Sequence, residues 1–306
     1  MVQRTQGFGG LRGRRGRVSH RLALSPSCWG ISEEKGWGHQ IAAERVLSEA
    51  AAVGEGAITA GPPGFLPDRS DRAKTLLRRM HIEVVGGQVH AILHHHETRG
   101  AELAHIDGHA HWLAAVGANT LVLSAIPERS PSGPRASALS KPEWAHLLNL
   151  VGSVEHVCAR HKLRLAVQPR FGSTIQGPEE IERLLVGSEA GVCLDVAHIV
   201  LAGADPTEVV ELAGGRIQHV HLNDVDGDIA RRVRDGSLDY REAVSRGLYT
   251  AVGEGAADVK RLTEALRAAS YRGWYTLEQE TRLTSVDDRP LGRISRSLEH
   301  VLPLLA

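Results

Sequence analysis

Short apolar runs alternate with helix-length amphipathic segments along nearly the whole chain. Eight runs have the character of β-strands, at residues 21–25, 57–60, 82–93, 120–125, 163–167, 192–194, 217–222 and 274–277. Each is followed by a segment of helical length, at 40–52, 71–80, 102–116, 142–161, 178–186, 205–213, 257–269 and 291–304. Strands that alternate with helices pair in parallel. Eight such units in about 285 residues predict a single-domain α/β fold, the (β/α)8 TIM barrel.

A doubly wound open sheet is the alternative arrangement of the same elements. Its dinucleotide-binding version has no support, because no GxGxxG follows the first strand and no GxxxxGK[ST] occurs. Two segments break the alternation, a loop rich in Ser and Pro at 127–140 and a long charged connection at 227–254. Gly253 and Gly255 at the end of the second connection suggest a tight turn or a hinge that lets this connection cover the pocket.

The first 20 residues differ in composition from the rest of the chain. They contain five arginines, five glycines and no acid, and they lack the apolar core of a secretory signal. We therefore predict a disordered basic N-terminal extension at 1–20 and a barrel at 21–306. The three cysteines, Cys28, Cys158 and Cys193, form no CxxC motif, which indicates a reduced, cytoplasmic setting.

Charge and hydropathy limit the partners. The chain has 36 basic and 36 acidic residues, and this balance argues against a nucleic-acid partner. No apolar run approaches the roughly 20 residues that a membrane-spanning helix needs, so no membrane partner is expected. A small-molecule partner fits these limits. The oligomeric state stays open, with a homo-oligomer as one alternative.

The segment 192–224 contains the most informative group of polar residues. The run 192–194 ends at Asp195, and His198 follows on what we interpret as a short loop. A helix then starts at Asp205-Pro206, where Asp caps and Pro fits the first turn. His219 and His221 are two apart in the next strand and so share one face. In a parallel unit, Asp195 and His221 would meet at one rim.

Other polar residues also follow the predicted strands. In a barrel they form a ring at the strand C-termini: Trp29, His39, Thr59, His94, His95, His96, Glu128, Arg129, Gln168, Arg170, Asp195, His198, His221, Asn223, Asp224, Glu278 and Glu280. Asp195, His221 and Glu278 come from three successive strands about 4.8 Å apart. They are predicted to bind one divalent cation, and the oxygen-rich set favours Mn²⁺ or Mg²⁺. The alternative is that Asp195 caps a loop and the other two are ordinary rim residues.

Several motifs in the same order resemble the xylose isomerase-like TIM-barrel superfamily of sugar isomerases, epimerases and inosose dehydratases. They are SPSCWGI, GWGHQ, GPPGFLP, CLDVAHIVLAGADP, RIQHVHLND, VGEGAAD and RGWYTLEQE, which together extend over most of the chain. The first three resemble, within the superfamily, the branch that contains myo-inosose-2 dehydratase.

The resemblance implies a metal-dependent enzyme of carbohydrate metabolism, and of inositol catabolism in that branch. The implied metal ligands are Asp195, His221, Glu278 and, on the fifth strand, Gln168. Mn²⁺ is the expected ion, with Co²⁺, Mg²⁺ and Zn²⁺ as alternatives. His198 is the implied substrate contact, and Glu278 is the candidate base.

Further substrate contacts are predicted at His94, Arg170, Trp29 and His39. Arg170 could bind an anionic group of the substrate or pair with Glu278. The chain departs from the family pattern at four positions. Gln168 replaces a usual Glu or His, Arg170 replaces a His, Asn223 replaces a Lys, and Thr59 replaces a Glu.

Three functions are compatible with these residues. The first is an isomerase, epimerase or dehydratase that removes a proton next to a metal-chelated carbonyl of a small sugar, keto-sugar or polyol such as an inosose. The second is an altered, non-catalytic barrel that binds such a ligand, which the four departures favour. The third is an endonuclease, but the neutral chain lacks the basic face that one requires.

Overall fold

The parallel strands close into a barrel, as the alternating pattern predicts. The structure is a computed structural model that describes residues 21–127 and 139–306. The strand order is β1-β10-β7-β6-β5-β4-β3-β2, and β1 pairs with both β10 and β2 to close the circle. The barrel strands are Leu22–Leu24 (β1), Ala57–Thr59 (β2), Glu83–Ala91 (β3), Thr120–Ala125 (β4), Arg164–Val167 (β5), Gly191–Asp195 (β6), Ile217–Leu222 (β7) and Trp274–Leu277 (β10).

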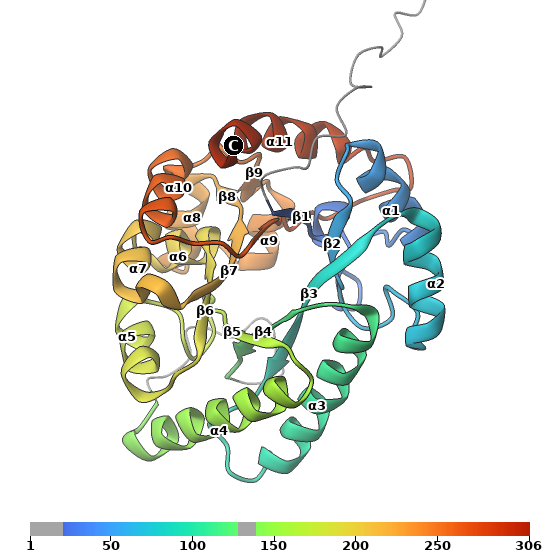
Figure 1. The fold of residues 1–306 in the computed structure, drawn as a ribbon. Coiled ribbons are helices and arrows are strands. Elements are labelled where there is room, and N and C mark those ends of the chain that lie inside the picture. The colour runs from blue at the N-terminus through green and yellow to red at the C-terminus, as the bar shows by residue number, and fades with distance from the viewer. Residues whose placement is uncertain (1–20, 128–138) are drawn as a thin grey trace, which may run out of the picture.

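Helices surround this barrel on the outside (Figure 1). Those predicted from the sequence begin and end within three residues of the expected positions. They are Ala43–Ala52 (α1), Ser70–Met80 (α2), Arg99–Val116 (α3), Lys141–Arg160 (α4), Pro178–Gly187 (α5), Pro206–Ala213 (α7), Val259–Ala268 (α10) and Leu291–Leu305 (α11). The predicted extension at 1–20 and the rim residues Glu128 and Arg129 lie outside the described residues. No helix in the described ranges has the length and apolarity to cross a bilayer.

The connections contain helices that the sequence pattern did not indicate, and one of them overturns a prediction. The residues after Asp195 form a short helix, Val196–Ala202 (α6), where a loop was expected. The charged connection at 227–254 contains two helices, Gly227–Arg234 (α8) and Tyr240–Ser245 (α9). These helices lie between the two strands of a small antiparallel ribbon, Asp224–Val225 (β8) and Tyr249–Thr250 (β9). Short 3₁₀ turns at Pro26–Trp29 and Gly214–Arg216 complete the described elements.

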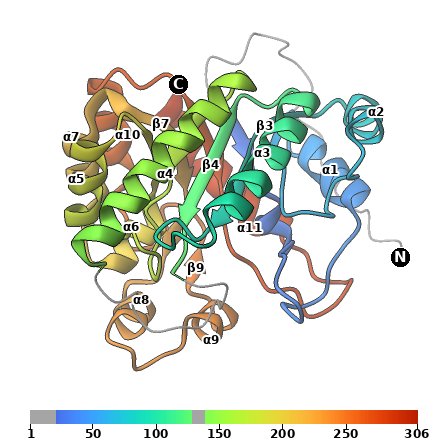
Figure 2. The same cartoon turned by 90° about the horizontal axis from the view of Figure 1, so that it is seen from below.

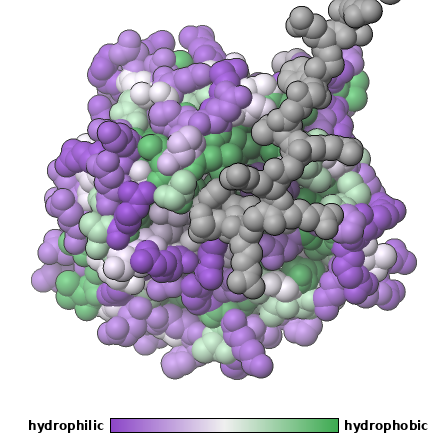
Figure 3. Space-filling view, turned by 45° about the horizontal axis from the view of Figure 1, so that its top comes forward, coloured by the Kyte–Doolittle hydropathy of each residue, from purple (hydrophilic) through white to green (hydrophobic). Residues whose placement is uncertain are grey.

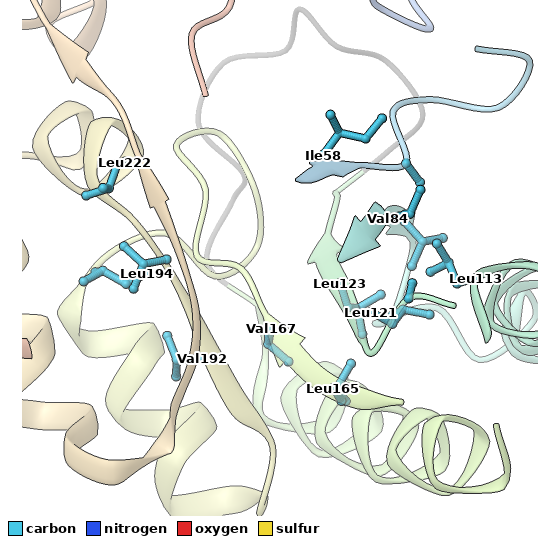
Figure 4. Packing of buried hydrophobic residues seen from close by; sticks show 14 of the residues in the cluster. Ile58, Val84, Leu113, Leu121, Leu123, Leu165, Val167, Val192, Leu194 and Leu222 are labelled. Atoms are coloured by element: carbon cyan, nitrogen blue, oxygen red, sulfur yellow. The ribbon is translucent and has the colours of Figure 1, made fainter. Parts of the chain in front are cut away.

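The helix-facing side of the strands carries the main hydrophobic core. Leu121 and Leu123 of β4 lie near Leu113 of α3, and Val167 and Leu194 continue the same layer around the barrel (Figure 4). All five side chains are fully buried. Hydrophilic residues occupy most of the periphery in Figure 3. Because apolar residues pack between strands and helices, the barrel interior is left to a different set of side chains.

The barrel interior changes from apolar to polar along its axis. Ala23, Ala57 and Val85 form one small apolar cluster, and Val122, Ala166 and Cys193 form another. Closer to the strand C-termini, the side chains that point into the barrel are polar. They are Gln88, Ser124, Gln168, Asp195 and His221. The apolar layers support a polar floor that faces the barrel mouth.

The ribbon and helices between β7 and α10 form a cap at this end of the barrel. This segment begins at Asp224, two residues after the end of β7, and connects to α10. Figure 2 shows α8 and α9 projecting beyond the barrel. The cap has a hydrophobic core of its own, in which Val225, Leu248 and Tyr249 pack against Ala197 and Leu201 of α6. The missed helix α6 is therefore the base on which the cap rests.

Candidate functional site

Asp195, His221 and Glu278 converge at the C-terminal ends of β6, β7 and β10. The Nδ1 atom of His221 lies 3.0 Å from Oδ2 of Asp195 and 2.9 Å from Oε2 of Glu278. One potential ligand atom from each residue lies within 4.8 Å of the other two. In the part of the chain that the structure describes, this is the one such group of three that could hold a metal ion. The predicted convergence of the three side chains is present.

Asp195 has two roles at once, because its two oxygens point in different directions. Its Oδ1 accepts the backbone N–H of His198 at 3.1 Å and so caps α6. Its Oδ2 faces His221. His198 therefore lies in the first turn of a helix rather than on a loop. Its ring is buried, its Nδ1 has no hydrogen-bond partner among the described residues, and it stacks 6.3 Å from the ring of Tyr240.

Gln168 occupies the fifth-strand position, but it presents its amide nitrogen to the cluster. This nitrogen donates to Oδ2 of Asp195 at 2.7 Å and lies 3.3 Å from Nδ1 of His221. Its Oε1 accepts from the Ser124 hydroxyl at 2.6 Å and from the Gln88 amide. An amide nitrogen is not a metal ligand, so the predicted coordination by Gln168 would require its amide to rotate. That rotation would give up both bonds at Oε1 unless Ser124 and Gln88 reversed their roles.

Asn223, where the family pattern has lysine, supports the cluster from the next strand. Its Nδ2 donates to Oδ1 of Asp195 at 3.0 Å, and its Oδ1 accepts the backbone N–H of Ala197 at 2.6 Å. The side chain thus ties β7 to the start of α6 and holds Asp195 in place. Fixed partners of this kind commonly orient metal ligands in proteins.

The charges of the cluster depend on one another. Burial alone would raise the pKa of Asp195, but the electrostatic interaction with His198, which is positive only under acidic conditions, and the hydrogen bond to His221 outweigh burial and lower it. Burial alone would lower the pKa of His221, but interactions with Cys193, Glu278 and Asp195 raise it well above its usual value. Burial lowers the pKa of His198 to about 4, so this imidazole is neutral at neutral pH.

A second polar group lies beyond the cluster. Nη2 of Arg170 lies 3.1 Å from Oε1 of Glu280, so the sequence alternative of a pair with Glu278 was wrong. The hydroxyl groups of Tyr240 and Tyr249 lie 2.8 Å apart, and burial together with the nearby charge of Glu280 raises the pKa of Tyr240. Both tyrosines come from the cap. Neither tyrosine was among the predicted site residues, because both lie in the segment that was interpreted as a connection.

Asp224 fastens the cap to the barrel. Its Oδ1 accepts the backbone N–H groups of Val225 and Ala257, and its Oδ2 accepts those of Gly253 and Gly255, all within 2.9–3.0 Å. The carboxylate is fully buried. A Cβ on Gly255 would lie 2.2 Å from Oδ1 of Asp224, so the backbone can approach the carboxylate only if this residue is glycine. Asp224 is thus a structural residue rather than a ligand.

The other predicted substrate contacts are placed less centrally. Trp29 is fully buried in the main core, and its Nε1 donates to Glu49 of α1 at 2.7 Å, which corrects its assignment to the pocket wall. The side chain of His39 is exposed, and its backbone N–H bonds to Leu283. His94 is buried after β3, with its ring 4.1 Å from that of His95. The structure does not bring Trp29 or His39 to the cluster.

The donor set fits a divalent cation. Two carboxylates approach the same Nδ1 of His221, which carries at most one proton to share between them. A cation in their midst could balance both carboxylates while the imidazole binds through its lone pair. Two carboxylates and one imidazole suit Mn²⁺, Mg²⁺ or Zn²⁺. The three residues that would hold the ion are Asp195, His221 and Glu278.

A closed parallel barrel with a polar cluster at the C-terminal rim of its strands defines a TIM barrel whose site lies where enzymes of this fold have their active sites. The family model described as xylose isomerase-like TIM barrel matches residues 47–302, and the chain belongs to this family. The fold and family predicted from the sequence are both confirmed.

Curated relatives cover most of the chain. It is 28% identical over 270 residues to the inosose dehydratase of Geobacillus kaustophilus, which covers 85% of this chain and 87% of that protein. It is also 28% identical over 275 residues to the rhizopine catabolism protein MocC of Rhizobium meliloti, covering 88% and 84%. These relatives agree with the resemblance to the inosose dehydratase branch.

Solved structures share the fold at lower identity. A crystal structure of the IOLI protein with a bound zinc atom has a TM-score of 0.67 and 14% identity, and covers 93% of this chain and 98% of that chain. D-psicose 3-epimerase of Clostridium cellulolyticum H10 with D-tagatose has a TM-score of 0.69 and 14% identity, covering 93% and 99%. At this identity the likeness supports the fold alone.

Proposed function

We propose that the protein is a divalent-metal-dependent dehydratase whose substrate is a small keto-polyol of the inosose class. The convergence of Asp195, His221 and Glu278 on one point carries the proposal. The curated relatives named inosose dehydratase support dehydration over the alternatives of isomerisation and epimerisation. All three reactions begin by removing a carbon-bound proton next to a carbonyl.

Each residue of the site has a role in this proposal. A bound divalent ion, Mn²⁺ in our proposal, would polarise the substrate carbonyl and make the neighbouring carbon more acidic. Glu278 is the base that accepts the carbon-bound proton, since its carboxylate is the one partly exposed member of the cluster. The neutral His198 binds a substrate hydroxyl through Nδ1, whose lone pair or proton has no partner among the described residues. Arg170 and His94 are proposed contacts at the rim.

A non-catalytic, ligand-binding barrel is the competing function. It is favoured by the neutral Gln168, which turns a nitrogen toward the cluster. Metal analysis and isotope exchange separate the two functions. The dehydratase should contain or take up Mn²⁺, Co²⁺, Mg²⁺ or Zn²⁺, melt at a higher temperature when it does, and incorporate solvent deuterium into an inosose.

The matched variants are Asp195→Asn and Asp107→Asn. Asp107 is a surface carboxylate that also contacts a histidine, His161, at 2.8 Å. We expect the change at Asp195 to abolish both the metal-induced rise in melting temperature and the deuterium uptake, and the change at Asp107 to alter neither. A wild-type protein that binds no divalent metal and exchanges no deuterium would refute the proposed function.

A further inference from the structure

His90 lies in the barrel wall opposite the metal cluster. It belongs to β3, two residues after Gln88, and alternate residues of a strand share one face. Gln88 points inward, because its amide contacts Gln168 and the Ser124 hydroxyl inside the barrel. His90 is paired in register with Ser124. The ring therefore faces the interior, one step closer to the barrel mouth than Gln88.

The strand order places β3 across the barrel from the cluster. Going around the circle, β3 is four strands from β7 and three from β10. In an eight-stranded barrel, four strands is half of the circumference. A molecule held at His221 and Glu278 would therefore have His90 on its opposite side. His90 was not among the predicted rim residues, because it lies within β3 and the predicted residues follow the strands.

The two nitrogens of His90 have very different surroundings. Nδ1 lies 3.1 Å from Oε1 of Glu33, on the loop after β1. Nε2 is buried and has no hydrogen-bond partner among the described residues. Buried polar atoms are nearly always hydrogen-bonded in folded proteins, so an unpaired one indicates a functional use or a missing ligand. A carboxylate on one ring nitrogen and a free second nitrogen is the arrangement that orients a histidine for proton transfer.

Glu33 places this pair near the mouth of the barrel. The hydrogen bond to His90 is the main cause that lowers the pKa of Glu33, and the charge of Arg170 lowers it further. Glu33 is therefore an anion that holds the His90 ring in place through Nδ1. Because the charge of Arg170 acts on Glu33, the pair Arg170–Glu280 lies near the pair His90–Glu33.

We propose that His90, oriented by Glu33, is the second acid–base residue of the site and protonates the departing hydroxyl group of the substrate. This inference rests on the proposed dehydratase function. Glu278 accepts the carbon-bound proton, and the C–H electron pair is first held in the enolate of the substrate carbonyl. That pair then forms the new C=C bond as the C–O bond to the neighbouring hydroxyl breaks, and the proton on Nε2 of His90 converts the departing hydroxyl to water. The proton on Glu278 then passes to solvent, and His90 regains one from solvent.

The test separates the two proton transfers in the full-length protein loaded with Mn²⁺. Deuterium uptake from solvent into myo-inosose-2 reports removal of the carbon-bound proton by Glu278. Appearance of the conjugated product, followed by its ultraviolet absorbance, reports loss of water. In His90→Asn we expect elimination to fall by about 10²–10⁴-fold, the range of general acid catalysis, while deuterium uptake stays within a few-fold of wild type. Calorimetry should give an unchanged affinity for Mn²⁺.

Two further variants keep the test decisive. Glu33→Gln changes only a loop residue and should lower elimination more than uptake, even if His90→Asn folds poorly. His161→Asn is the matched control, because His161 also contacts a carboxylate, that of Asp107, but the two residues lie at the end of α4 and on α3, outside the barrel. It should change neither rate. The inference is overturned if His90→Asn or Glu33→Gln lowers both rates in parallel or lowers neither. A wild type without either activity overturns the proposed function as well.

Discussion

Replacing Asp224 by asparagine is expected to detach the cap from the barrel. The carboxylate accepts four backbone N–H groups, two on each oxygen. An asparagine of the same shape keeps one oxygen, which can continue to accept from Val225 and Ala257. Its amide group would face the N–H groups of Gly253 and Gly255, and donors would then oppose donors.

The expected cost follows from these two lost bonds. A buried hydrogen bond to a charged group contributes about 1.5–3 kcal/mol, so two of them amount to about 3–6 kcal/mol. The loss should appear first as local opening of the cap, because the barrel strands do not depend on Asp224. A local opening that is easier by this amount accelerates amide exchange at Gly253 and Gly255 by about 10²–10⁴-fold.

Hydrogen exchange followed by mass spectrometry, together with urea unfolding, measures both effects. Asp107→Asn is the matched control, because Asp107 is a surface carboxylate whose ion pairs should contribute less than about 1 kcal/mol. Since the cap supplies Tyr240 and Tyr249, Asp224→Asn should also weaken substrate binding while the affinity for metal stays the same. The reasoning is refuted if Gly253 and Gly255 exchange as slowly as in the Asp107 control and stability is equal in the two variants.

Three other predictions concern the cluster and its surroundings. Gln168→Glu places a second carboxylate about 4 Å or less from that of Asp195, and their repulsion costs about 4 kcal/mol in the metal-free protein. The melting temperature of this variant should therefore be lower than that of wild type without Mn²⁺ and higher than that of wild type with Mn²⁺. Equal shifts with and without Mn²⁺ would contradict this. The folded-state pKa of His221 is raised, so the metal-free protein gains stability that is complete below about pH 6.5 and is lost as pH rises through the folded pKa. A metal ion must displace the proton on the His221 ring, so calorimetry should show tighter metal binding and less proton release as pH rises. A metal affinity that does not depend on pH would argue against His221 as a ligand. Glu280→Gln leaves the Arg170 charge without its partner, which should lower the free energy of unfolding by about 1–3 kcal/mol. Inorganic phosphate should then bind Arg170 and raise the melting temperature of this variant. No thermal shift with phosphate would show that Arg170 stays inaccessible.

The alternation of strands and helices could be predicted because it depends on local periodicity. The strands Thr120–Ala125, Ile217–Leu222 and Trp274–Leu277 begin and end at the predicted residues, since each is a short segment in which β-branched or aromatic residues recur. The helix Val196–Ala202 was missed because it has only seven residues, and its capping depends on Asp195. Helices α8 and α9 were missed because they are short and rich in charge, and their apolar faces match a partner surface on α6.

The sequence by itself determined the barrel and the three residues at the ends of β6, β7 and β10, because strand C-termini meet at one rim in any closed parallel barrel. Only the tertiary structure decided what surrounds them. Closure of the barrel brings His90 across from His221, and the fold of the cap brings Tyr240 beside His198. It also decided that Gln168 turns its nitrogen inward, because the amide follows the hydrogen-bonding demands of Ser124 and Asp195, which lie on two other strands. These relations join residues far apart in the chain, and local periodicity contains no information about them.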